Sequence, residues 1–297
     1  MSRWAYVDGA YRPLGSDAIA IEDRGFQFAD GVYEVWSLRD GRLLDHSEHM
    51  ARLDRSLGEL RIASPMSHAA LTAVLVETAR RNRLQDGLVY LQVTRGAAPR
   101  DHGFPANATP TVVVTARGID RKAHEQRARE GVGVVTMPDI RWRRCDIKSV
   151  SLLPNVLAKQ AAREAGGYEA WLVDDDGLVT EGASSTAWIV DGDGRLRTRP
   201  LGDDVLPGVT RAQLITLARE RQMAVDETPF TVADAMAARE AFMSAASAVA
   251  IPVVRIDGAT VGDGKPGPVS LALRAAYYGG ADADASVPQL LRRSRAG

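Results

Sequence analysis

The sequence predicts an α+β protein with two domains. Its 297 residues favour about two domains, each large enough to have its own core. Predicted strands and helices mix without the regular strand–helix–strand alternation of a doubly wound sheet. Over 118–129 the chain becomes highly charged and loses its apolar period. We therefore expect a small N-terminal α+β domain over 1–119, a linker over 120–125, a large C-terminal domain over 126–280 and a loosely ordered tail over 281–297.

Apolar periodicity in the N-terminal half predicts strands and two helices. The strand Trp4–Val7 turns back at Asp8-Gly9 as a hairpin. Ser47 is the expected cap of a helix whose apolar face carries Met50, Leu53, Leu57 and Leu60. Three more strands are predicted over 31–39, 88–95 and 111–117, and a second helix is predicted over 68–81.

In the C-terminal half, short β-branched and aromatic runs are interspersed with helical patterns. Thr210 follows Pro207-Gly208 and is the expected N-cap of a helix over 210–222. Other helices are predicted over 152–165, 231–238 and 269–278, and strands over 133–137, 169–173, 186–190, 195–198, near 225, and over 240–243 and 253–256.

Composition excludes several classes of partner. The net charge of −1 and the pI of about 6.5 provide no basic field for nucleic acid or anionic lipid. One cysteine, Cys145, suits a reducing compartment and allows no internal disulfide. The longest apolar run, 241–254, is too short to span a bilayer, and the N-terminus has no signal-peptide core. We expect a cytoplasmic protein without nucleic-acid or membrane partners.

Common catalytic motifs are missing from the sequence. The five histidines have no metal-ligand spacing, and no G-x-S-x-G nucleophile motif occurs. The segment GDGKPG at 262–267 matches G-x-G-x-x-G but lacks the strand–turn–helix context of a dinucleotide site, so a turn is the better interpretation. A hydrolase, a metalloenzyme and a nicotinamide-dependent enzyme are therefore disfavoured.

Lysines are rare in this chain. The 37 basic residues comprise four lysines and, by difference, 33 arginines. Lys122 and Lys265 lie in charged or turn segments and Lys159 on a polar helix face, whereas Lys148 has mostly apolar neighbours in DIKSVSLL. Apolar surroundings lower the pKa of a lysine amine and make it nucleophilic, as Schiff-base chemistry requires. On the local pattern alone, a lysine at the end of a strand whose ammonium reaches solvent is the favoured interpretation.

Four further features are candidates for ligand binding. The turn LPGVTR presents the backbone N–H groups of Val209 and Thr210 at a helix start, which suits a phosphate. Arg52 either binds the same phosphate or pairs with Glu48. Glu181, in VTEGASST between two strands, is locally no more than a turn acid. The last feature is a loop with two cations, Arg100 and His102, that suit a carboxylate.

Together these stretches resemble the fold-type IV pyridoxal-phosphate transaminases, the class of D-amino-acid and branched-chain aminotransferases. The resemblance covers about residues 1–280 and favours the catalytic reading of Lys148. Seven segments occur in the family's order: EDRGFQFADGVYEV, EHMARL, QVTRGAAPRDH, DIKSVSLLPNVLAKQ, VTEGASS, LPGVTR and IDGATVGDGKPG.

The resemblance implies pyridoxal 5′-phosphate (PLP, or its pyridoxamine form PMP) as cofactor and a role for each candidate residue. Lys148 is expected to form a Schiff base with PLP and to move the substrate proton, and Glu181 to keep the pyridine nitrogen protonated. Arg52, Val209 and Thr210 are expected to hold the phosphate. Ala246 stands where the family commonly has a threonine, so that only its backbone N–H and the neighbouring Ser247 can replace the hydroxyl contact. Tyr33, Arg100 and His102 are expected to bind the substrate carboxylate.

The R-G-x-x-x-R-x-H pattern that includes Arg100 and His102 resembles the D-amino-acid branch, in which this loop reaches the neighbouring subunit of a homodimer. The expected activity is ping-pong transamination between a D-amino acid and a 2-oxo acid. An (R)-selective amine transaminase and a branched-chain L-amino-acid aminotransferase are alternatives of the same fold. A cofactor-free relative that binds metabolites or partners is the alternative from another class.

Overall fold

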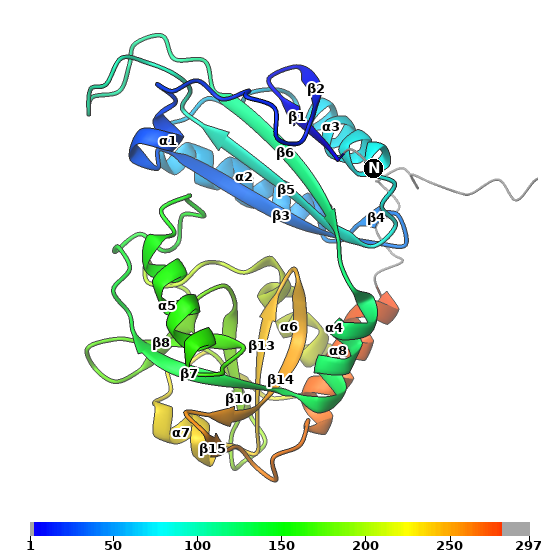
Figure 1. Cartoon of the computed structure of the whole chain (residues 1–297). Coiled ribbons are helices and arrows are strands. Elements are labelled where there is room, and N and C mark those ends of the chain that lie inside the picture. Colours follow the sequence, from blue (N-terminus) through cyan, green and yellow to red (C-terminus); the bar gives the residue numbers. More distant parts are fainter. Residues whose placement is uncertain (1–2, 281–297) are drawn as a thin grey trace, which may run out of the picture. The chain divides into compact units, whose positions relative to one another are not determined.

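The computed structural model of the chain describes residues 3–280 (Figure 1). Two compact units are present. Within the described residues, the first comprises 3–119 together with Ile147–Ser151, and the second comprises Asp120–Asp146 and 152–280. The segment Ile147–Ser151, which carries Lys148, therefore packs with the first unit. The sequence instead places it in the C-terminal domain predicted over 126–280.

The first unit is built on a six-stranded antiparallel sheet. Its strand order is β2-β1-β6-β5-β3-β4. Alternation along β3 sends Val32, Glu34 and Trp36 to one face and Tyr33 to the other. The strands are β1 (Trp4–Val7), β2 (Ala10–Pro13), β3 (Gly31–Arg39), β4 (Arg42–Leu43), β5 (Gly87–Thr94) and β6 (Thr111–Gly118), and the helices are α1 (Arg24–Phe28), α2 (His46–Glu59) and α3 (His68–Arg81).

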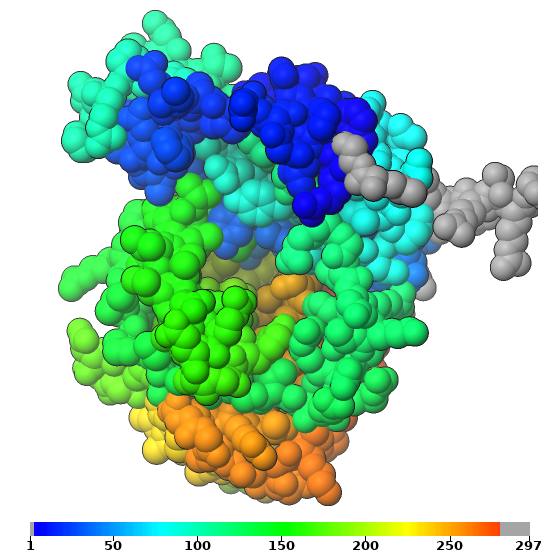
Figure 2. Space-filling model, in the orientation of Figure 1, coloured from blue at the N-terminus to red at the C-terminus, as the bar shows by residue number. Residues whose placement is uncertain are grey.

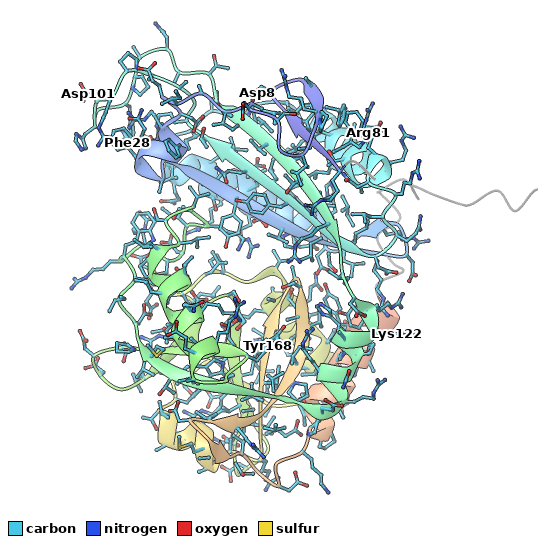
Figure 3. The ribbon with its side chains drawn as sticks, viewed as in Figure 1. Asp8, Phe28, Arg81, Asp101, Lys122 and Tyr168 are labelled. Atoms are coloured by element: carbon cyan, nitrogen blue, oxygen red, sulfur yellow. The ribbon has the colours of Figure 1, made fainter. Side chains whose placement is uncertain are left out.

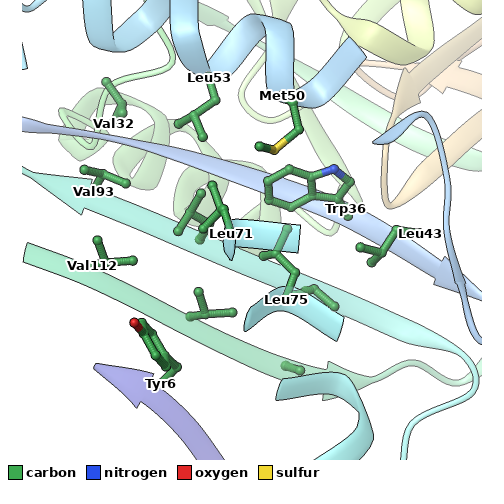
Figure 4. Close-up of a cluster of buried hydrophobic side chains, with 14 of the residues drawn as sticks. Tyr6, Val32, Trp36, Leu43, Met50, Leu53, Leu71, Leu75, Val93 and Val112 are labelled. Atoms are coloured by element: carbon green, nitrogen blue, oxygen red, sulfur yellow. The ribbon is translucent and has the colours of Figure 1, made fainter. Parts of the chain in front are cut away.

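Helices α2 and α3 cover the Trp36 face of this sheet. Figure 4 shows Met50 and Leu53 of α2 and Leu75 of α3 in one cluster with the fully buried Trp36. The predicted apolar stripe of α2 is thus confirmed, except that Leu60 is only partly buried. Ser47 is not the cap, because α2 starts one residue earlier, after Asp45 in a left-handed conformation.

The second unit contains a nine-stranded mixed sheet in the order β12-β11-β10-β13-β14-β7-β8-β9, with β15 paired to β14. Strand β7 runs parallel to both β8 and β14. The strands are β7 (Val132–Pro138), β8 (Glu169–Val173), β9 (Val179–Gly182), β10 (Thr186–Val190), β11 (Leu196–Arg197), β12 (Val225–Asp226), β13 (Glu240–Ala245), β14 (Ala248–Ile256) and β15 (Ala259–Thr260); the helices are α4 (Arg121–Glu130), α5 (Leu153–Glu164), α6 (Val209–Glu220), α7 (Val232–Ala237) and α8 (Pro268–Gly280).

Three local expectations differ from the structure. The stretch 120–125, predicted as a linker, begins helix α4, which Asp120 caps through Ala123 N at 3.0 Å. Helix α6 starts at Val209 with Gly208 as its N-cap, so Thr210 is not the cap. Glu181 lies within strand β9 and not in a turn. The tail predicted over 281–297 lies outside the described residues.

Among residues 3–280, no helix is long and apolar enough to cross a membrane. The same part of the chain contains no group of three or more His, Cys, Asp or Glu side chains placed to hold a metal ion.

Candidate active site

The segment with Lys148 forms part of the edge of the first unit's sheet. Strand β4 pairs only with the far end of β3, and Ile147–Ser151 lies against its near end. Tyr33 N donates to Lys148 O at 3.0 Å, and Val150 N donates to Gly31 O at 3.0 Å. Ile147 is 4% exposed and belongs to the Trp36 core. The backbone of Lys148 is therefore held by β3 on one side and by a core residue next to it.

The Lys148 amine lies on an aromatic surface. Its Nζ atom is 4.2 Å from the centroid of the Tyr33 ring, and the side chain is half-buried. Tyr33 stacks on Tyr90 with ring centroids 5.6 Å apart. Burial, followed by the nearby Tyr33, raises the pKa of Tyr90 to about 12. Two stacked rings on the face away from α2 and α3 thus lie against the amine.

Arg52 is held in a buried ion pair. Its Nε donates to Glu34 Oε1 at 2.7 Å and its Nη2 to Glu34 Oε2 at 2.9 Å. His49 Nδ1 lies 2.7 Å from the same carboxylate. Burial alone would raise the pKa of Glu34, but Arg52 and His49 outweigh it and lower the pKa to about 2. Glu34 therefore fixes the direction of Arg52 without any contribution from a ligand.

The backbone of Lys148 is also tied to helix α2. Lys148 N donates to Ser56 Oγ at 3.3 Å, and Ser56 lies one helical turn beyond Arg52. The first unit thus connects Lys148, Tyr33 and Arg52 through direct contacts and one shared helix.

In the second unit, Glu181 pairs with an arginine that sequence reasoning missed. Arg141 Nη1 donates to Glu181 Oε1, and its Nη2 and Nε donate to Asp139 at 2.7 and 2.9 Å. Burial would lower the pKa of Arg141, but the bond to Asp139 and the charge of Glu181 raise it. The pairs with Asp139 and Glu181 thus favour the charged form of Arg141. As one of 33 arginines, Arg141 carries no signal of its own in the sequence.

The start of helix α6 provides donors without a protein acceptor. Gly208 supplies no side-chain cap, and the hydroxyl of Thr210, which is 3% exposed, has no hydrogen-bond partner among the described residues. Buried hydroxyls are normally paired, so this one indicates a missing acceptor at the helix N-terminus. A phosphate fits both the charge and the donors.

Glu181 and the helix start are connected. Leu206 N, three residues before α6, donates to Glu181 Oε2 at 3.3 Å. Gly208 lies against Thr186, which pairs with Ser244 across β10 and β13. Ser244 is two residues before the turn of Ala246 and Ser247 that joins β13 to β14. The second unit thus brings together Glu181, the α6 start and the strand leading to Ala246.

Arg100 and His102 lie on the exposed loop between β5 and β6. Figure 2 shows this loop at the surface of the first unit, beside α1. The roles of the predicted site residues stay predictions, and the structure adds Arg141, Glu34 and His49 as their direct neighbours.

Comparison with known proteins is consistent with the resemblance. The family model described as amino-transferase class IV matches residues 31–256. A D-alanine aminotransferase of Bacillus licheniformis is 43% identical over 253 residues, 85% of this chain and 88% of that protein. A D-alanine aminotransferase of Staphylococcus haemolyticus is 37% identical over 273 residues, 92% of this chain and 95% of that protein.

Solved structures show the same fold. The branched-chain amino acid aminotransferase of Escherichia coli superimposes with a TM-score of 0.86 at 24% identity and covers 94% of both chains. A hypothetical aminotransferase from Mycobacterium tuberculosis in its PLP-bound form gives a TM-score of 0.81 at 23% identity, over 94% of this chain and 98% of that chain.

Proposed function

The chain belongs to the amino-transferase class IV family, and on this premise we propose that D-alanine is one of its amino donors and a 2-oxo acid its acceptor. It is a PLP-dependent aminotransferase of the D-amino-acid branch, with the ping-pong cycle general for the family. The observation that carries our assignment of the reacting amine is the placement of Lys148 Nζ on the Tyr33 ring.

The residues at the start of α6 fit the phosphate of PLP. The unpaired Thr210 hydroxyl and the N–H groups of Val209 and Thr210 would hold it, and Ala246 would contribute its backbone N–H. Arg52 would supply the positive charge, in a direction already fixed by Glu34. Preformed donors are favourable because little conformational entropy is lost when the ligand binds.

When bound, PLP supplies an aldehyde that captures amines and an electron-withdrawing pyridinium ring. We assign to Lys148 Nζ the attachment of the cofactor, which it would hold covalently, and it would move the proton to and from the substrate Cα. We assign to Glu181, kept ionised by Arg141, the hydrogen bond that keeps the pyridine nitrogen protonated. Tyr33 positions the amine, since its ring lies directly beneath Nζ.

Arg100 and His102 are assigned to the substrate carboxylate, with Tyr33 beside it. A fixed carboxylate decides which face of Cα is presented to Lys148, and thus which enantiomer reacts. We propose a homodimer in which this loop serves the neighbouring subunit's site. Its support is the exposure of both cations and of two apolar side chains on or before α1, Ile21 at 84% and Phe26 at 77%.

A dilution series tests the dimer. Specific activity should fall as the protein dissociates, with dissociation followed by sedimentation. A monomer with undiminished activity would contradict the shared site. We also propose a cytoplasmic location, supported by the single cysteine.

The branched-chain reading has weaker support. The branched-chain enzymes share the fold at low identity, whereas the D-alanine enzymes share substantially more of the sequence. The R-G-x-x-x-R-x-H pattern also favours the D-amino-acid branch.

Absorption spectra test the proposal. The purified protein with PLP should show a visible band that D-alanine converts to the pyridoxamine form and L-leucine does not. Conversion by L-leucine alone would move the enzyme to the branched-chain side, and faster conversion by (R)-1-phenylethylamine than by D-alanine would favour an amine transaminase. Lys148→Ala is the control; if it still formed the same band, the assignment of Lys148 would be wrong.

A further inference from the structure

The loop that carries Arg100 and His102 rests on a buried arginine. Arg24, on α1, is 3% exposed, and its Nη1 donates to Asp101 O at 2.6 Å. Its Nη2 donates to His102 O at 3.4 Å. Arg24 therefore binds the main chain at His102 and at the residue between the two cations. No catalytic role has been assigned to it above.

Arg24 is itself fixed by a shared carboxylate. Its Nε donates to Asp30 Oδ2 at 2.8 Å, and Arg95 donates to both oxygens of Asp30 at 2.8 and 2.9 Å. Burial would raise the pKa of Asp30, but the bonds to Arg95 and Arg24 lower it. Arg24 and Arg95 share the one carboxylate of Asp30. The Nη1 and Nη2 groups of Arg24 donate to the carbonyl oxygens of the loop instead.

Arg100 and His102 pack on one ring. The guanidinium of Arg100 lies 4.6 Å from the centroid of Phe28, and the ring of His102 lies 5.3 Å from it. Arg24 lies 4.8 Å from the same centroid. Figure 3 labels Phe28 and Asp101, which lie close together at the end of α1. The half-buried Phe28 ring thus positions the side chains of Arg100 and His102 relative to each other.

The rest of the loop is held as well. Arg24 N donates to Gly96 O at 2.9 Å where the loop begins. Gly96 has φ of +99°, and a Cβ there would meet Thr109 O, so only glycine fits. Phe104 lies beneath Arg95, whose guanidinium carbon is 3.7 Å from the ring centroid. The loop is exposed, but several hydrogen bonds and ring contacts hold it in one conformation. A change at Arg24 or Phe28 should therefore disturb that conformation.

We propose that Arg24 and Phe28 are positioning residues that aim Arg100 and His102 at the substrate carboxylate and so set the enzyme's affinity for amino donors that carry one. This inference rests on the proposed function. It predicts an effect on carboxylate binding and none on cofactor attachment, since neither residue contacts Lys148, Arg52 or Tyr33 in the described structure.

The test uses two conservative variants in the full-length holoenzyme. Arg24→Lys keeps the charge beside Asp30 but cannot span both carbonyl oxygens, and Phe28→Leu keeps an apolar residue but removes the ring. Arg81→Lys is the matched control, because Arg81 also pairs with a carboxylate, Glu77 at 2.8 Å, and lies over a ring, Tyr11 at 4.2 Å.

Three quantities are measured: kcat and KM for D-alanine, the Kd of propionate from its effect on the visible band, and the Kd of PLP. Propionate has the carboxylate without the amine and reports on carboxylate binding separately from the reaction. Each test variant should raise the KM of D-alanine and the Kd of propionate together, by about tenfold, with kcat changed less than about twofold. The Kd of PLP should not change, and Arg81→Lys should match the unsubstituted enzyme throughout.

An unchanged KM and propionate Kd in both variants would overturn the inference. A parallel loss of kcat, PLP affinity and thermal stability would also overturn it, because that pattern indicates a structural role. Failure of the proposed function is distinguishable, because the unsubstituted enzyme would then not react with D-alanine.

Discussion

Lys148 and Tyr33 are joined twice. Tyr33 N donates to Lys148 O at 3.0 Å, and the Lys148 amine lies 4.2 Å from the centroid of the Tyr33 ring. The first contact fixes the backbone and the second fixes the end of the side chain. The amine therefore has a defined position before any substrate is present.

Removal of the Tyr33 ring should leave the Lys148 amine without the contact that fixes its position. We expect Tyr33→Leu to slow the appearance of the visible band on PLP addition by about two- to fivefold, the worth of a cation–π contact. Tyr33→Phe keeps the ring and should form the band at the normal rate. Equal losses in both variants would assign the effect to the hydroxyl group.

Cofactor retention should respond to hydroxyl groups near the start of α6. Ala246→Thr is expected to tighten PLP binding about fivefold, or about 1 kcal/mol, by adding the hydroxyl the family commonly has. Thr210→Val should weaken it by a similar factor, because the unpaired hydroxyl is removed. The Kd of the apoenzyme for PLP is the measurement.

Thr216→Val is the control for both changes. It lies on the same helix, but its hydroxyl already donates to Ala212 O at 3.2 Å. If Thr216→Val weakened PLP binding as much as Thr210→Val, the specific role of Thr210 would be wrong.

The buried carboxylate of Glu34 should make the free energy of unfolding depend on pH. Its pKa falls from 4.5 to about 2 in the folded state, so the unfolded state binds more protons as pH drops below 4.5. The stabilisation is present above that pH and is lost as pH falls toward 2, on the order of 3 kcal/mol in all. Urea unfolding of the apoprotein at pH 7, 4 and 3 measures it.

Glu34→Gln should be less stable at pH 7 and should lose less stability toward pH 3. Glu77→Gln is the control, because Glu77 pairs with Arg80 and Arg81 near the surface, where such pairs contribute little. A Glu34→Gln curve parallel to that of the unsubstituted protein would contradict the prediction.

Glu240 should stabilise helix α8 from outside the helix. Its buried carboxylate accepts from Val269 N at 2.8 Å and from Ser270 N and Oγ at 3.0 Å each. Glu240→Ala removes the acceptor of the Val269 and Ser270 N–H groups, whereas the Ser270 hydroxyl can still donate to Gly267 O at 3.0 Å, and the change should lower the free energy of unfolding by about 2–3 kcal/mol. Glu240→Gln keeps an acceptor and should lose about half as much. Equal losses in both would show that the charge, and not the acceptor, matters.

The sequence predicted those elements whose own pattern is strong. The predicted ranges of strands β3 and β10 and helix α3 agree with the structure, since β-branched runs and an apolar helical stripe mark them. Helix α1 was missed because five residues carry no periodicity, and α4 because its apolar contact with the sheet is limited to buried Ala128.

The candidate site was predictable only residue by residue. Lys148 stands out because lysines are rare and its neighbours are apolar. Arg141 and Glu34 could not be found as site residues, because the predicted site residues that they bind, Glu181 and Arg52, are 40 and 18 residues away and arginines are abundant. Pairing across such separations depends on the fold, which no local pattern encodes.

The course of the chain through Ile147–Ser151 limits how the protein can be divided. A fragment ending at Ile119 would lack the segment that pairs with Gly31 and Tyr33, and it would leave a void where Ile147 fills the core. An open strand edge of this kind favours aggregation. A fragment starting at Asp120 would carry Lys148 without the ring beneath its amine. Limited proteolysis or split expression at this boundary would thus produce two incomplete halves.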